Sequence, residues 1–168
     1  MYLYLIRHGI AQEHQLDIKD EERSLTIEGR KKTEKIAQRL IQLKFKFDLI
    51  LTSPLVRAKQ TAEILMQSGL SSQLETSLHL SWEGNVHNWI QEWLERKRHD
   101  QKYDQQTHLA LVGHEPCLSS WAEILVWGEA KEKLILKKAG MIGIEVPDNG
   151  SIVGHGQMFW LTPPRYLL

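Results

Sequence analysis

Short apolar segments alternate along the chain with longer segments in which apolar and charged residues are mixed. Apolar runs of this length, bounded by glycine, proline or polar residues, are typical of buried strands. They predict strands at residues 3–6, 47–53 and 107–116, with a weaker, partly alternating one at 73–80. Two later runs, 140–146 and 156–161, flank the turn sequence "PDNG" and predict a pair of closing strands.

The longer segments carry apolar residues at helical spacing. Ile36, Leu40 and Leu43 share one helical face, and charged residues occupy the opposite face. Val86 and Trp89 begin a similar apolar face further along the chain. The pattern predicts helices over residues 23–43, 53–67, 85–98 and 116–128.

Several helix ends are also indicated by residue type. Thr26 is suited to the N-cap of the first helix. Ser53 is suited to the N-cap of the second, because Pro54 follows it and fits the first helical position. Gly128 fits the end of the last helix. These signals agree with the periodicity and support the same set of elements.

Strands that alternate with helices predict an α/β fold, with a mostly parallel central sheet between two helical layers. The two closing strands, joined by a turn, are expected to add an antiparallel edge. We find no repeat, low-complexity segment or Pro/Gly/Ser-rich linker, so we expect residues 1–168 to form a single domain. The predicted architecture is therefore a three-layer α/β/α sandwich.

Composition narrows the classes of function. The chain has 21 Lys plus Arg and 21 Asp plus Glu, and this lack of basic excess argues against a nucleic-acid partner. No apolar stretch has the length of a membrane span, and we see no secretory signal. The single cysteine, Cys117, excludes an intramolecular disulfide. We expect a cytoplasmic protein that binds neither nucleic acid nor membrane.

Polar residues that are suited to catalysis or anion binding follow three of the predicted strands. The first strand ends in Arg7, His8 and Gly9, the second leads to Arg57, and the strand at 107–116 ends with His114. Ligands of open α/β sheets bind beyond the carboxyl ends of the strands, where helix N-termini favour anions. Two arginines and two histidines at such positions predict a binding site for a phosphoryl group.

Other phosphate chemistries do not fit the sequence. The residue six positions after Cys117 is Glu123, so the Cys–Arg loop of cysteine phosphatases is missing. There is no GxxxxGK[ST] loop and no Cys/His cluster with zinc spacing. A metal held by His8 and His114 would be repelled by the two arginines. We expect neither a metal nor a cofactor.

The stretches "LIRHG", "SPLVRAKQTAEIL" and "LVGHEP" together resemble the three motifs of the histidine phosphatase superfamily, which has the phosphoglycerate mutase-like fold. The stretches "LKKAGMIGIEV" and "WLTPPRYLL" further resemble the short SixA-type phosphohistidine phosphatases. The similarity extends from the first strand nearly to the C-terminus. The three motifs in this order are far more specific than "RHG" alone.

The resemblance implies an enzyme in which His8 is the nucleophile and becomes phosphorylated. It implies that Arg7, Arg57 and His114 bind the phosphoryl group as catalytic and substrate-binding residues. The SixA-type branch implies hydrolysis of phosphohistidine on a phosphotransfer protein in bacterial signalling. The chemistry is consistent, since nearby arginines disfavour the imidazolium form of His8, and they supply positive charge without a metal.

Two alternatives remain open from the sequence. Larger members of the superfamily place an acidic proton donor after the third strand, and Glu83 in "LSWEGN" falls in that region. If Glu83 is a proton donor, a small phosphorylated molecule becomes the better substrate, because an alkoxide leaving group needs an acid. The other interpretation of Glu83 is a solvated loop residue. A non-catalytic phosphate-binding module is the third hypothesis, although all four pocket residues are present.

Overall fold

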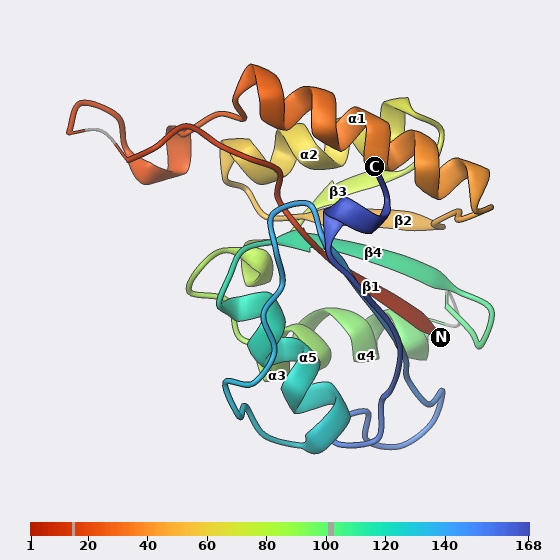
Figure 1. Cartoon of the computed structure of the whole chain (residues 1–168). Coiled ribbons are helices and arrows are strands. Elements are labelled where there is room, and N and C mark those ends of the chain that lie inside the picture. The colour runs from red at the N-terminus through yellow and green to blue at the C-terminus, as the bar shows by residue number, and fades with distance from the viewer. Residues whose placement is uncertain (15, 101–102) are drawn as a thin grey trace.

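A six-stranded sheet with the strand order β3-β2-β4-β1-β5-β6 is the middle layer of the computed structural model, which describes residues 1–14, 16–100 and 103–168 (Figure 1). The four strands on one side of the sheet run parallel, and the last two pair in antiparallel fashion. This confirms the predicted mixed sheet. The strands are β1 (Tyr2–Arg7), β2 (Leu49–Thr52), β3 (Leu74–Thr76), β4 (His108–Gly113), β5 (Met141–Glu145) and β6 (Gln157–Thr162).

Helices cover both faces of the sheet (Figure 1). On one face lie α1 (Ile27–Gln42) and α2 (Val56–Gln67). On the other lie α3 (Val86–Trp89), a π-helical turn (Ile90–Leu94), α4 (Glu95–His99) and α5 (Cys117–Trp127). Short 3-10 turns occupy Asp20–Glu22, Leu78–Leu80 and Pro164–Tyr166. Among the described residues, every helix is too short or too polar to cross a lipid bilayer.

The central strands are apolar on both faces because helices cover both. In β1, Leu3 and Leu5 pack with the core beneath α5, while Tyr4 and Ile6 pack with the core beneath α1 and α2. Successive side chains of a strand point to opposite faces, so each strand contributes to both cores. Full burial of a leucine stabilises the fold by about 2 kcal/mol. The continuous apolar runs in the sequence follow from this arrangement.

The start of α1 matches the sequence prediction. The Thr26 side chain accepts a hydrogen bond from the backbone N–H of Gly29 at 2.9 Å, which is an N-cap interaction. Gly29 also lets the first turn of α1 approach the chain that follows β1. A Cβ atom at this position would lie 2.0 Å from the carbonyl oxygen of Ile10. The end of α5 is likewise as predicted, with Gly128 at a φ of 84°.

A buried carboxylate fixes the segment between α5 and β5. Glu123 on α5 is fully buried, and its two carboxylate oxygens accept four backbone N–H groups at 2.5–2.7 Å. Burial by itself raises the pKa of Glu123, but the hydrogen bonds outweigh it and hold the pKa below its ordinary value. The segment therefore leaves α5 along a fixed path. The four donors are Lys131, Glu132, Lys133 and Leu134.

Candidate active site

The carboxyl ends of three neighbouring parallel strands meet at one edge of the sheet. In register, Arg7 of β1 lies beside Gly113 of β4, and Thr52 of β2 lies beside Val112. The residues that follow these strands therefore emerge side by side. The sequence prediction placed its polar residues at this edge for the same reason.

The structure brings His8, Arg57 and His114 into direct proximity. The ring centroids of His8 and His114 are 5.1 Å apart, and Arg57 Nε lies 3.3 Å from His8 Nε2. All three side chains are buried, with exposed fractions of 6%, 5% and 2% for His8, Arg57 and His114. The site is thus a small, largely desolvated cluster in which electrostatic interactions are strong.

The hydrogen bonds of His8 define its tautomer. His8 Nδ1 lies 2.7 Å from the carbonyl oxygen of Gly9, which can only accept, so Nδ1 carries the proton. Nε2 is then unprotonated, and its lone pair accepts a hydrogen bond from Arg57 Nε. An unprotonated imidazole nitrogen of this kind can act as a nucleophile.

The surroundings of His8 keep it neutral. Burial and the neighbouring His114, followed by the charges of Arg57 and Arg7, lower the pKa of His8 to about 3, against the opposing hydrogen bond to Gly9. A ring with this pKa is unprotonated at neutral pH. Its Nε2 lone pair is therefore available without a separate general base.

Arg57 is held in place by a residue that the sequence analysis missed, Asp20. Arg57 Nη1 donates to the backbone oxygen of Asp20 at 2.6 Å, and Nη2 donates to its carboxylate at 2.8 Å. These contacts occupy the end of the guanidinium and leave its Nε edge facing His8. Burial pushes the pKa of Asp20 upward, but hydrogen bonds from Arg23 and Arg57 hold it below its ordinary value. In the sequence, Asp20 sits in the acidic run "DEE" and has no signal that separates it from a solvated loop residue.

Arg7 is half-buried, and only part of its hydrogen-bonding capacity is used within the described residues. Its Nη1 donates to the carbonyl oxygen of Leu136 at 2.9 Å, whereas its buried Nε has no partner there. Burial lowers the pKa of Arg7, and the nearby Glu115 opposes this shift. A buried donor without a partner is costly unless water or a ligand satisfies it. Arg7 therefore contributes positive charge and a free donor beside the histidines.

His114 forms a hydrogen bond with Ser53, which corrects the predicted role of that serine. His114 Nε2 lies 2.8 Å from Ser53 Oγ, while its buried Nδ1 has no partner among the described residues. The N-cap of α2 is Leu55, not Ser53, and no side chain caps the helix. Burial and the charge of Arg57, with a smaller contribution from Arg7, lower the pKa of His114 to about 4. The hydroxyl of Ser53 is thus used to orient a histidine of the site.

Glu83 has no polar link to Arg7, His8, Arg57 or His114 among the described residues. It lies in the exposed turn after Leu78–Leu80, and no hydrogen bond or ion pair joins it to the cluster within the described chain. The same turn is tied to the start of α5, since Cys117 Sγ donates to the carbonyl oxygen of Trp82 at 2.9 Å. Burial and Glu115 raise the pKa of Cys117, which agrees with a packed thiol.

Comparison with known families covers most of the chain. A family model described as histidine phosphatase superfamily (branch 1) matches residues 3–122, a range that contains the whole polar cluster. A protein of Picosynechococcus sp., described as uncharacterised, is 41% identical over 170 residues, which span 100% of this chain and 99% of that protein.

Solved structures share the fold. The structure of the protein histidine phosphatase SixA complexed with tungstate has a TM-score of 0.81 and 22% identity, over 100% of both chains. The alpha-ribazole phosphatase from Shigella flexneri has a TM-score of 0.71 and 18% identity, over 98% of this chain and 97% of that one. At these identities the likeness shows the fold alone, and it confirms the expected phosphoglycerate mutase-like architecture.

Proposed function

Since the chain belongs to branch 1 of the histidine phosphatase superfamily, and is thus a phosphatase, we propose that its substrate is phosphohistidine on a partner protein. The nucleophile in this proposal is His8. One observation carries it: the Nε2 lone pair of a neutral, buried His8 faces the guanidinium of Arg57 at 3.3 Å. A phosphoryl group attached at that nitrogen would lie directly beside the arginine.

In the first step, His8 Nε2 forms a bond to phosphorus as the bond between phosphorus and the substrate nitrogen breaks. A substrate ring that is protonated on its second nitrogen leaves as neutral imidazole and takes the electron pair of the broken bond. Charge on the equatorial oxygens is stabilised by Arg57, Arg7 and a donor from His114. Positioning and charge stabilisation are the main demands of phosphoryl transfer, and these side chains are suited to both.

In the second step, water attacks phospho-His8 in line, the P–Nε2 bond breaks, and inorganic phosphate leaves. The hydrogen bond from Nδ1 to Gly9 matters here. Because Nδ1 keeps its proton throughout, the phosphorylated ring is cationic and departs from phosphorus as neutral imidazole. The proton released by the water goes to phosphate or solvent. Splitting the reaction in this way replaces one hard step with two easier ones.

Phosphohistidine is favoured over a phosphate ester because the pocket residues include no carboxylic acid to protonate a leaving oxygen. Asp20 accepts a hydrogen bond from Arg57 and carries a lowered pKa. Glu115, near Arg7, accepts hydrogen bonds from the backbone N–H and the hydroxyl of Ser119. An imidazole leaving group needs no such acid, whereas an alkoxide does. The SixA structure that shares this fold is described as a protein histidine phosphatase, which supports the same choice.

A small-molecule phosphomonoesterase is the second candidate, and one observation favours it. The turn that carries Glu83 is anchored to the start of α5 through Trp82 and Cys117, so it lies at the same edge of the sheet as His114. A modest shift of this turn on substrate binding would supply the missing acid.

A paired rate assay tests the proposal. Wild type, His8→Asn and the control His87→Asn, which changes an exposed histidine on α3, are assayed with chelator present. The substrates are a phosphohistidine-bearing phosphotransfer domain and an aryl phosphate. We expect fast loss of phosphohistidine that requires His8 but not His87, and slow ester hydrolysis. A strong preference for the ester would instead support the second candidate, and phosphate binding without turnover of either substrate would support a binding module.

Trapping the intermediate adds a second readout. Quenching with alkaline detergent during turnover of ³²P-labelled substrate should leave label on wild type that is stable in base and is lost on later treatment with acid, as expected for a phosphoramidate. His8→Asn should carry no label. Label on a residue other than position 8 would contradict the assignment of the nucleophile.

A further inference from the structure

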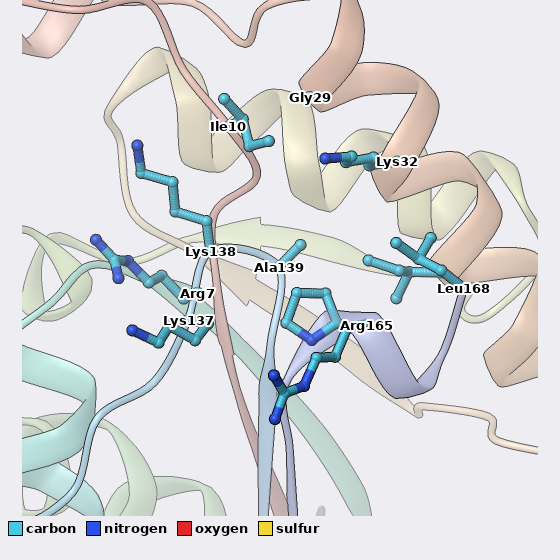
Figure 2. A pocket seen from close by; sticks show the side chains of 11 residues that line it. Arg7, Ile10, Gly29, Lys32, Lys137, Lys138, Ala139, Arg165 and Leu168 are labelled. Carbon is cyan, nitrogen blue, oxygen red and sulfur yellow. The ribbon is translucent and has the colours of Figure 1, made fainter.

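A groove of about 420 Å³ begins at Arg7 and runs between the first turns of α1, the segment before β5 and the C-terminal residues (Figure 2). Its floor is apolar and includes Ile10, Ile36 and Ala139. Its rim is positively charged, and no acidic side chain lines it. We call this feature the cationic groove, defined by the side chains of Arg7, Lys32, Lys137, Lys138 and Arg165.

The charge of the groove is a local concentration in a chain of zero formal net charge. Among the described residues, Lys137 and Lys138 form no ion pair, and Arg165 stacks on Tyr166 with 4.8 Å from its guanidinium carbon to the ring centroid. Lys32 pairs with Glu28 at 2.7 Å, but the two side chains are 44% and 66% exposed, and an ion pair so accessible to water is weak. The positive charge is therefore available to a ligand.

Two lysines of the groove are rigidly linked to the proposed nucleophile. The backbone N–H of Ala139 donates to the carbonyl oxygens of Arg7 and His8 at 3.0 and 3.1 Å, and that of Gly140 donates to Lys137 at 2.7 Å. Ala139 adopts a φ of 60°, a left-handed conformation that residues other than glycine rarely adopt. This tight turn holds Lys137 and Lys138 at a set position relative to His8.

A second groove, of about 540 Å³, adjoins the first and shares Lys137, Pro164 and Arg165 with it. It follows the edge strand β6, where Leu161 is 46% exposed, and it includes Ile135, which is 68% exposed. Large exposed apolar side chains next to unpaired cations are typical of a surface that contacts another protein. The combined surface extends well beyond the phosphoryl pocket.

We propose that the cationic groove docks an acidic segment of the phosphohistidine-bearing partner, an inference that rests on the proposed function. In Figure 2, Lys32 reaches from α1 toward the space above Ala139, while Arg7, Lys137 and Lys138 extend on the other side of it. Aspartate or glutamate side chains near the phosphohistidine pair with these lysines and with Arg165. Apolar residues of the same segment cover the exposed floor. The phosphorylated ring then reaches His8 past Arg7.

The positive charge of the groove favours a partner with acidic residues around its phosphohistidine. The phosphoryl pocket already provides Arg7, Arg57 and His114 for the phosphoryl group, so the remaining cations serve other anionic groups. Opposite charges across an interface give specificity and speed up association, with a strong dependence on salt. A phosphoprotein with basic or neutral surroundings of its phosphohistidine would be a poorer substrate.

Two phosphohistidine peptides that differ only in flanking residues test the docking site. One carries three glutamates beside the phosphohistidine, and the other carries glutamines at those positions. The measured quantity is the ratio of kcat/KM for the two peptides, determined for each variant at low salt. Because both peptides are compared on the same variant, any change in the chemical step cancels in the ratio.

We expect wild type to prefer the acidic peptide by about 10-fold, the product of several weak ion pairs. The preference should vanish or invert in Lys137→Glu/Lys138→Glu. It should persist in the control Lys46→Glu/Arg96→Glu, which reverses two exposed charges outside both grooves. Equal rates for the two peptides on wild type, or an unchanged ratio in the groove variant, would overturn the docking site.

Turnover of phosphoramidate separates this proposal from the proposed function. This small substrate has a P–N bond but no flanking residues. If wild type hydrolyses phosphoramidate and both peptides alike, the docking site is wrong and the proposed function stands. If wild type cleaves none of the three P–N bonds, the proposed function itself is wrong.

Discussion

The proposed phosphoryl pocket, formed by Arg7, His8, Arg57 and His114, and the cationic groove both contain cationic side chains, but the two regions differ in burial and in hydrogen bonding. In the pocket, His8, Arg57 and His114 are buried, and hydrogen bonds to Gly9, Asp20 and Ser53 fix their orientations. In the groove, Lys137 and Lys138 are exposed and unpaired among the described residues. A reacting group must be held to within fractions of an ångström, whereas a docking cation must be accessible. Rigid burial therefore indicates chemistry, and accessible charge indicates recognition.

Removal of Arg57 should have the largest effect on this contrast. In Arg57→Ala the His8 lone pair loses its facing guanidinium and Asp20 loses its partner. We expect kcat on phosphohistidine to fall about 10³-fold, as when a transition-state arginine is lost. Arg57→Lys should recover little activity, because one ammonium group cannot contact both Asp20 and His8 as the guanidinium does.

The readout is steady-state kinetics with circular dichroism as a check on folding. A fall of less than 10-fold in Arg57→Ala, with the fold intact, would mean that Arg57 is a structural partner of Asp20 rather than a part of the reaction. In that case burial of a cation in the pocket would not indicate a role in catalysis.

The dependence of the free energy of unfolding on pH should show an effect of intermediate size, because neutral histidines are buried in the pocket. His8 and His114 have pKa values lowered to about 3 and about 4, below the ordinary 6.5 that they regain on unfolding. As the pH falls below 6.5, these two histidines become protonated in the unfolded chain but stay neutral in the folded chain. The stability is thus fully present above pH 6.5 and is lost as the pH falls toward 3–4.

Each histidine contributes a slope of at most about 1.4 kcal/mol per pH unit to this loss. Between pH 6.5 and 5 His8 and His114 act together with His108, whose pKa is also lowered by burial, because the lowered pKa values of Asp20 and Glu123 act only below the ordinary carboxyl range. Urea unfolding at several pH values should show the slope in wild type and a smaller one in His8→Asn. A stability that is flat over this window in wild type would show that the pocket histidines are solvated rather than buried.

The contrast also explains how much the sequence could reveal. Arg7, His8 and His114 follow apolar strands directly, and the carboxyl ends of neighbouring parallel strands must meet, so their grouping was predictable. The mixed sheet and the N-cap at Thr26 were predictable from local periodicity and residue type.

The remaining features depend on contacts between loops. Asp20 reaches Arg57 across 37 positions of sequence, and Ser53 is drawn from its expected N-cap role by a histidine 61 residues away. The cationic groove joins the start of α1, the turn before β5 and the C-terminal residues, which no periodic pattern connects. Loop residues follow no periodic pattern in the sequence, so their grouping is seen only in the folded structure. The extent of the domain, residues 1–168, stays a prediction.

Substitution of Glu83 should have the smallest effect on phosphohistidine turnover. It also tests whether the turn that carries Glu83 is part of the active site. Its carboxylate is exposed and makes no described contact with His8, Arg7, Arg57 or His114. We therefore expect Glu83→Gln to change phosphohistidine turnover by less than about 2-fold, as should the control Glu75→Gln on β3, since neither carboxylate touches the reacting groups. The discriminating measurement is the aryl phosphate rate, because only an oxygen leaving group needs the acid. A 10²–10⁴-fold loss there, the usual contribution of a general acid, would make Glu83 a proton donor that moves into the pocket on binding. The protein would then act on phosphate esters, and the exposed turn that carries Glu83 would be part of the active site.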